Sequence, residues 1–197
     1  MPRRLLLSLL LALPAPALAA DPARTVPPEL AELLDAARED LRQGRPEQAA
    51  RRLQAHPGPD HALLRLLLGH AEARRNRLAE AARAYRRALE MDEDLAAAGV
   101  ALAHVRARQD DWPEAARLLG RYLDTNACPA DELYLYAQAA RRLEDARLVR
   151  LLADKGVVRF PGDERFRRLD LAVSLEQRND AAAADAAAAL LRRRPTE

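Results

Sequence analysis

Residues 69–94 read GHAEARRNRLAEAARAYRRALEMDED and align without a gap on residues 103–128, AHVRARQDDWPEAARLLGRYLDTNAC. Small residues recur at the same shift, in one column of Gly69, Ala103 and Ala137 and in another of Ala81, Ala115, Val149 and Ala183. Self-similarity at a fixed period of about 34 residues indicates a chain built from repeated supersecondary units.

Each period contains two helical patterns. The apolar residues of LLRLLLGHAEA (63–73) and LAEAARAYRRAL (78–89) recur with helical spacing, and strand alternation appears nowhere. Breaks fall at Gly44, at Asn76 and at Asp111, where Glu114 three residues later completes a capping box. Further turn signals separate the periods in HPGPD (56–60), CPAD (128–131) and FPGD (160–163). The sequence therefore predicts an all-α fold with two helices per period.

In these features the sequence resembles the tetratricopeptide repeat family, whose motif has the same length. The second period is the closest match: it has Gly69 at the small position of the first helix, Asn76 at the turn, and Ala81, Tyr85 and Ala88 in the second helix. We expect the alanines to form a seam between helices and Tyr85 to lie in the core. Other periods depart further from the family's pattern, the fourth through Val149, Ala153 and Gly156.

The resemblance implies a right-handed superhelix, an α-solenoid of about five helix pairs, over residues 30–195. The approximate motifs are 30–59, 62–95, 96–129, 130–163 and 164–197. It also implies a non-catalytic scaffold that binds another protein along a concave groove. The family's carboxylate clamp uses Asn and Lys at groove positions, and these residue types are missing there, so that specificity is not expected.

Residues 1–20, MPRRLLLSLLLALPAPALAA, have the pattern of a secretory signal peptide. Arg3 and Arg4 precede an apolar run from Leu5 to Leu13, which is too short to span a membrane. We expect cleavage near Ala20, a linker over 21–29, and a periplasmic chain, or alternatively a secreted one. Removal of residues 1–20 takes away two arginines and no acid, so the net charge falls from +2 to zero. A neutral exported chain is not expected to bind nucleic acid.

No catalytic motif appears in the sequence. GxSxG, HExxH, CxxC and glycine-rich phosphate loops are all missing from it. Cys128 is the single cysteine, so no internal disulfide is possible, and a half-buried structural thiol is expected. The sequence predicts neither an enzyme nor a bound metal or cofactor. A metal-dependent activity at His70 and His104, which occupy the same position of successive motifs, is the less favoured alternative.

Polar pairs recur near the end of the first helix of successive motifs. The family's geometry would turn these positions towards the groove, over an apolar floor of Leu34, Leu66, Val100 and Tyr134. Two interpretations remain: arginines that are solvated at a helix end and favoured by its dipole, or a ladder that binds an acidic segment of an envelope protein. The candidate groove residues are Arg38, Arg42, His70, Arg74, His104, Arg108, Tyr134, Gln138 and Arg142.

Self-association is a further alternative. The alanine-rich stretch 181–191 offers an apolar face at the end of the repeat array, where terminal repeats can pair edge to edge. The sequence names neither the partner nor the oligomeric state.

Overall fold

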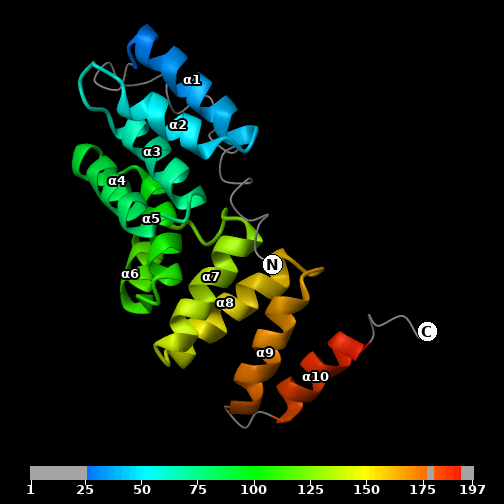
Figure 1. Ribbon diagram of the computed structural model, residues 1–197. Helices are drawn as coiled ribbons and strands as arrows, with labels where there is room; N and C mark the ends of the chain where they lie inside the picture. Colours follow the sequence, from blue (N-terminus) through cyan, green and yellow to red (C-terminus); the bar gives the residue numbers. More distant parts are fainter. Residues whose placement is uncertain (1–25, 177–179, 192–197) are drawn as a thin grey trace. The chain divides into compact units, whose positions relative to one another are not determined.

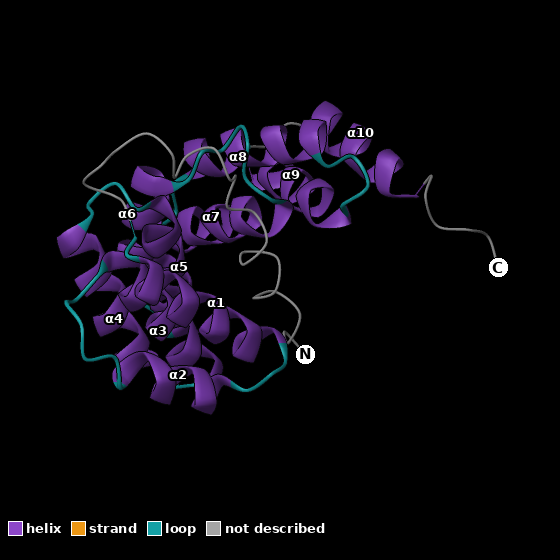
Figure 2. Ribbon diagram, turned by 90° about the horizontal axis from the view of Figure 1, so that it is seen from above, coloured by secondary structure: helices purple, strands orange, loops and turns teal. Residues whose placement is uncertain are grey.

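The computed structural model describes residues 26–176 and 180–191. These residues form ten helices and no strand (Figures 1 and 2), which confirms the predicted all-α fold. The predicted signal peptide and most of the linker lie outside the described residues. The helices are α1 (Pro28–Arg42), α2 (Pro46–Gln54), α3 (Ala62–Arg74), α4 (Leu78–Met91), α5 (Ala96–Arg108), α6 (Trp112–Tyr122), α7 (Ala130–Arg142), α8 (Ala146–Arg159), α9 (Glu164–Glu176) and α10 (Asp180–Leu191).

The described helices divide into two compact units, with α1 to α5 in Met1–Gln109 and α6 to α10 in Asp110–Glu197. Within each unit, helices that follow one another in the chain pack together, as α3 and α4 do in the first and α7 and α8 in the second. The boundary between the units falls between α5 and α6, inside the motif expected at 96–129, and the extent of the expected repeat domain over 30–195 stays a prediction. Each unit has its own buried cluster of apolar residues. The superhelical path stays a prediction.

A residue with left-handed backbone conformation follows the first helix of four successive pairs. These residues are Gly44, Asn76, Asp110 and Glu144, with φ angles of 74°, 62°, 60° and 58°. After α3 the amide of Arg77 donates to the carbonyl of Glu72 at 2.9 Å, and equivalent bonds close the turns after α1 and α7. Such turns satisfy carbonyl groups that a helix end leaves without partners. They fix where the last residues of each first helix lie.

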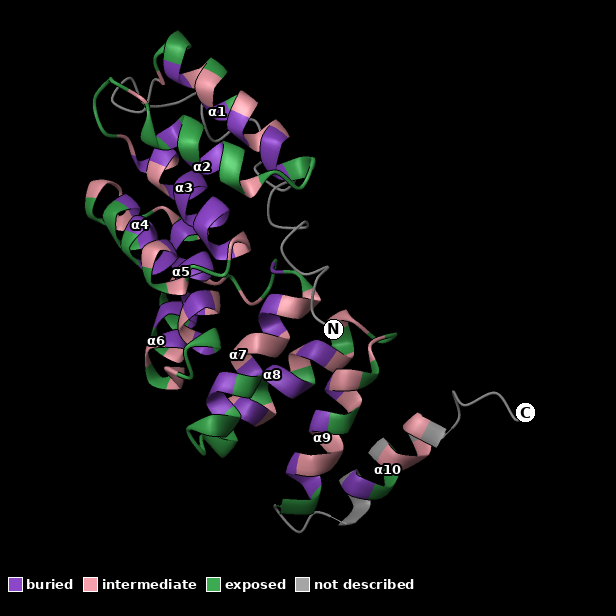
Figure 3. Cartoon of the chain, viewed as in Figure 1, coloured by how far each residue is buried: buried purple, intermediate pink, exposed green. Residues whose placement is uncertain are grey.

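The second motif contributes a close-packed part of the interior of the first unit. α3 is buried along most of its length (Figure 3), and Tyr85 of α4 is only 1% exposed, which confirms its predicted place in the core. Gly69 makes room for this ring, because a Cβ atom at Gly69 would stand 2.4 Å from Cε1 of Tyr85. Gly69 and Tyr85 are therefore complementary in size.

The core of the second unit is centred on Phe166 of α9, which is fully buried. Its ring stacks on Phe160 and meets the edge of Tyr134, with centroid distances of 5.8 Å in both cases. A Cβ atom at Gly156 of α8 would stand 1.9 Å from Cδ1 of Phe166. The departure of the fourth motif at Gly156 therefore has a packing reason, since α8 must admit an aromatic ring from the next helix.

Candidate functional site

Two of the arginines expected to bind a partner, Arg74 and Arg108, instead bind backbone groups of this chain. Arg74 lies at the end of α3 and donates from Nη1 to the carbonyl of Leu41, in the last turn of α1. Arg108 at the end of α5 repeats this arrangement, donating to the carbonyl of Ala73 at 3.4 Å and to Oδ1 of Asn76 at 2.6 Å. A guanidinium group is well suited to this place, because the carbonyl groups at a helix end carry partial negative charge. Both arginines fasten one first helix to the end of the preceding one.

His70 is not on an open surface. Its side chain is 7% exposed, and Nδ1 lies 2.9 Å from the hydroxyl of Tyr85. Burial lowers the pKa of His70 from 6.5 to about 4, and the nearby positive charge of Arg74 acts in the same direction. The ring is therefore neutral at pH 7 and belongs to the core. His70 is thus packed against Tyr85 of α4, and its expected place in a partner-binding groove stays a prediction.

The expected floor of the groove is also covered. Leu34, Leu66 and Val100 are all buried, so they form part of the packed interior. Arg38 pairs with Asp35 at 2.7 Å and Arg42 pairs with Glu39, in both cases one turn earlier on the same helix. His104 is half-buried. The expected floor residues thus lie in the core of the first unit, whereas Arg38 and Arg42 pair with acids of their own helix.

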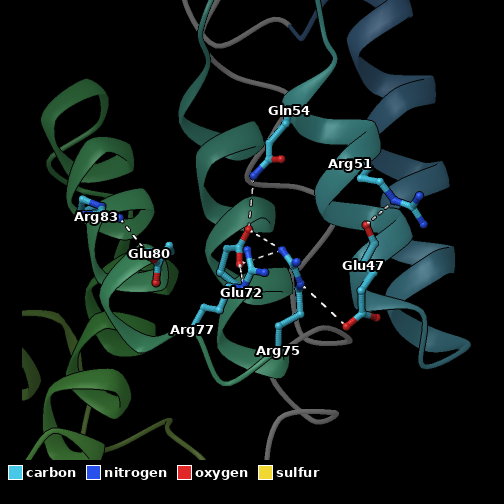
Figure 4. A network of polar contacts seen from close by, with 8 residues as sticks. All are labelled: Glu47, Arg51, Gln54, Glu72, Arg75, Arg77, Glu80 and Arg83. Carbon is cyan, nitrogen blue, oxygen red and sulfur yellow. Dashed lines mark hydrogen bonds and ion pairs between the residues drawn. The ribbon is translucent and has the colours of Figure 1, made fainter.

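A network of polar contacts beside these arginines is structural as well (Figure 4). Glu72 of α3 is 2% exposed and binds Nη1 of Arg75 at 2.9 Å. Nε2 of Gln54, at the end of α2, donates to the same carboxylate at 3.3 Å. Arg77 approaches its other oxygen at 4.0 Å. A buried carboxylate needs such partners, and this one joins α2 to the end of α3.

The candidates of the second unit are arranged differently. Tyr134 is half-buried against Phe166, and Arg165 lies over its ring at 4.9 Å. Arg165 in turn pairs with Asp131 at 2.8 Å and with Asp163 at 2.6 Å. Tyr134 therefore lies between the core and an arginine that is already paired with two carboxylates. Gln138 and Arg142 are exposed near the end of α7.

Gln138 and Arg142 line a pocket of about 420 Å³ together with Arg141 and Trp112. Trp112 begins α6, and the guanidinium of Arg142 lies over its indole ring at 5.2 Å. Neither Arg141 nor Arg142 pairs with a carboxylate among the residues that the structure describes. We call this arrangement the Trp112 pocket. It offers two guanidinium groups, one amide and one aromatic face, which suit a carboxylate next to a flat or apolar group.

A second pocket, of about 310 Å³, also has Arg141 in its lining. Its apolar wall is formed by Val149 of α8 together with Leu169 and Val173 of α9. Its charged members are Arg141, Glu144 and Glu176. We call it the α8–α9 hollow. The remaining lining residues are Ala146 and Ala172.

Sequence reasoning named Gln138 and Arg142 but missed Trp112 and Arg141. A signal was available for the second of these. Arg38 and Arg42 each follow an acid by three residues, whereas Gln138 and Ala139 stand three residues before Arg141 and Arg142. Arg141 and Arg142 thus lack the acid one turn earlier that pairs with Arg38 and with Arg42.

Other candidate chemistry receives no support from the geometry. Across residues 26–176 and 180–191, no three His, Cys, Asp or Glu side chains lie close enough together to hold a metal ion. None of the helices in this part of the chain is both long and apolar enough to span a membrane. Cys128 is buried, and burial raises the pKa of its thiol. Residues 181–191, expected as a self-association face, belong to α10, which packs on α9 and has Ala183 buried.

Comparison with solved structures finds helical-repeat proteins. A double mutant of MamA from RS-1 superposes with a TM-score of 0.74 at 16% sequence identity, over 85% of this chain and 96% of that one. MamA residues 41 to the end from Desulfovibrio magneticus RS-1 give 0.70 at 17% identity, over 85% and 94%. MamA from AMB-1 gives 0.74 at 14% identity, over 83% and 90%. The likeness is one of fold. No protein-family model and no curated protein matches the sequence.

Proposed function

We propose that this chain is a non-catalytic adaptor that binds another protein of the cell envelope through the Trp112 pocket. One observation carries the proposal: Arg141 and Arg142 lie beside Trp112 at the end of α7, and no carboxylate of the described residues pairs with them. Arginines elsewhere in the described chain are often paired with acids, as Arg45 and Arg52 both are with Asp40. Two open guanidinium groups beside a tryptophan therefore stand out from the rest of the surface.

The chemistry of the pocket favours a protein ligand. Arginine and tryptophan are the residue types most enriched among those that dominate binding energy in protein interfaces. A guanidinium can hold a carboxylate through two parallel hydrogen bonds, and the indole face can cover an apolar neighbour. The amide of Gln138 adds both a donor and an acceptor for a peptide group. An acidic segment of a partner would be bound by these groups together.

The proposed binding site is smaller than the groove that the sequence predicts. Arg74 and Arg108 already bind carbonyl groups of the preceding helix, so they are not offered to a partner. Gln138 and Arg142 keep their proposed role, and Arg141 and Trp112 join them. The site lies where α7 ends, beside the start of α6, within the second unit.

Export to the periplasm is part of the proposal, and it rests on the charge and apolar pattern of residues 1–20. Fusion of residues 1–30 to an alkaline phosphatase that folds only outside the cytoplasm tests it. We expect an active fusion whose activity is lost when Leu9 and Leu10 are replaced by arginine. An inactive unaltered fusion would contradict export.

Photocrosslinking tests the binding site. A benzophenone amino acid at Gln138 is expected to trap a discrete partner in intact cells, because this position lines the Trp112 pocket. The same probe at Gln48, an exposed position on α2, is the matched control. Adducts of equal yield at both positions, or none at Gln138, would contradict the proposal.

A further inference from the structure

Glu132, in the first turn of α7, is a buried acid that is only partly satisfied. The residue is 3% exposed, and its Oε2 atom has no hydrogen-bond partner among the residues that the structure describes. No arginine or lysine of these residues forms an ion pair with it. A buried charge without a partner is costly, so this site favours the neutral carboxyl over the carboxylate.

The residue that precedes α7 explains why this side chain lacks a partner. Glu132 is the third residue of the helix, where a glutamate can reach back to the backbone N–H of the capping residue. In α7 the capping residue is Pro129, which has no N–H and no side chain that caps the helix. The side chains of Asp111 and Asp145 cap α6 and α8. The first turn of α7 therefore lacks the cap that holds the starts of α6 and α8.

The surroundings of Glu132 oppose its ionisation. Burial raises the pKa of its carboxyl, the hydrogen bond from its own backbone amide acts in the opposite direction, and the charge of Asp131 raises the pKa further. The thiol of Cys128, just before the helix, also interacts with it. Arg159 of α8 lies 3.5 Å from that sulfur, but it already binds the carbonyl groups of Thr125 and Cys128, both at 2.6 Å.

Histidine cannot give the second unit a response to pH near neutrality. The last of the four histidines is His104, so residues 110–197 contain none. A carboxyl whose pKa is raised by burial can instead change its charge as the pH rises from acid towards neutral. Asp154 also has a raised pKa, but its side chain is 61% exposed, so it can ionise where it stands. Glu132 differs because its carboxylate must leave the interior to reach water.

We propose that ionisation of Glu132 opens the first turn of α7. The neutral carboxyl stays in the interior, whereas the carboxylate releases its proton to solvent and moves out to water together with the uncapped turn. Cys128 and Leu133 belong to the same buried cluster, so a first turn that moves away leaves the thiol open to water. The folded turn holds a proton that the open turn has already released. Its stability is therefore full at acid pH and falls as the pH rises through the pKa of folded Glu132.

This opening is separate from the proposed partner site. The residues of α7 that line the Trp112 pocket, Gln138, Arg141 and Arg142, lie at the other end of the helix. Opening of the first turn and capture of a partner are measured by different experiments, so the failure of one leaves the other to be judged on its own.

Labelling of Cys128 measures the opening, because this buried residue is the single cysteine of the chain. The relative rate is the rate at which a dipyridyl disulfide labels the folded chain, divided by the rate for an unfolded peptide of residues 123–133 at the same pH. The division removes the ordinary pH dependence of thiolate attack. From about pH 5 to about pH 8, the relative rate of the unaltered chain should rise about fivefold or more, as expected for a buried polar group without a partner.

Two variants remove the ionisable group, Glu132→Gln and Glu132→Leu. Both should show a relative rate that stays constant with pH and is lower than that of the unaltered chain at about pH 8. The charge of Glu132 raises the pKa of Cys128, so without an opening the unaltered chain would be labelled more slowly than the variants. The two explanations therefore predict opposite orders of rate.

Asp154→Asn is the matched control and should follow the unaltered chain, because this exposed carboxyl ionises without moving. Far-UV circular dichroism checks that each variant is folded. A relative rate of the unaltered chain that stays constant with pH would overturn the proposal. So would a rise that is equally large in Glu132→Gln and Glu132→Leu.

Discussion

Replacement of Gly69 by alanine tests the packing at the centre of the first unit. The added Cβ would stand 2.4 Å from Cε1 and 2.5 Å from Cδ1 of Tyr85. Carbon atoms in favourable contact are about 3.5–4.0 Å apart, so the ring must move by about 1 Å. Tyr85 is buried and its hydroxyl lies 2.9 Å from Nδ1 of His70, so this movement disturbs a hydrogen bond as well as the packing.

The magnitude follows from three contributions. Overpacking a core costs about 1–3 kcal/mol, and loss of the hydrogen bond to His70 costs about 1 kcal/mol. Alanine in place of glycine inside a helix gains about 1 kcal/mol. Gly69→Ala should therefore lower the free energy of unfolding by about 1–3 kcal/mol. The measurement is urea unfolding followed by far-UV circular dichroism, with the fluorescence of Trp112 reporting on the second unit.

Two further variants separate the clash from other effects. At Gly120 a Cβ would stand 2.9 Å from the hydroxyl of Tyr136 and 3.7 Å from its Cζ, so the close contact involves only the far end of one side chain. Gly120→Ala should therefore be neutral or slightly stabilising. The third motif has Ala103 and Leu119 in the columns of Gly69 and Tyr85, so adding Tyr85→Leu to Gly69→Ala should recover part of the lost stability. A Gly69→Ala protein as stable as the unaltered chain would refute the reasoning.

Three further predictions concern the stability of the folded chain. As the pH falls from 6.5 towards 4, His70 takes up a proton in the unfolded chain but not in the folded one, so the free energy of unfolding should drop by up to about 3 kcal/mol. A pH series of urea unfolding should show this drop in the unaltered chain and in His56→Gln, but not in His70→Gln. Glu72→Ala should lower the free energy of unfolding by about 1–3 kcal/mol, whereas Glu80→Ala, which breaks only the exposed pair with Arg83, should cost under about 1 kcal/mol by the same assay. Arg74→Ala should destabilise the chain by about 1.5–3 kcal/mol, because the hydrogen bond to the carbonyl of Leu41 is lost, whereas Arg142→Ala should leave thermal stability nearly unchanged. Equal effects of the two variants would contradict the different roles assigned to these arginines.

The fold could be predicted from the sequence because its main determinants are periodic and local. The columns of Gly69 and Ala81 mark where helices approach closely, and Asn76 and Gly44 mark the turns by their tolerance of left-handed backbone. The division into two units could not be predicted, since the same repeat period continues across Gln109 and Asp110.

The candidate site was predicted only in part. Helical spacing shows on which side of a helix an arginine lies. The acceptor that its long side chain reaches depends on the neighbouring helix. Arg74 and Arg108 end at carbonyl groups of the preceding motif, whereas Arg142 ends over the ring of Trp112. For the same reason the burial of His70 could not be predicted: its partner, Tyr85, lies on the next helix, and only packing shows that the pair is covered.

Charge reversal at the Trp112 pocket tests the central claim most directly. The measurement is the yield of the crosslink from a photoreactive residue at Gln138 in intact cells, with and without Arg142→Glu. Because Arg142 has no ion pair to lose among the described residues, the variant should fold normally while losing the crosslink, and Arg83→Glu on α4 should retain it. An undiminished crosslink from the folded Arg142→Glu chain would contradict the account.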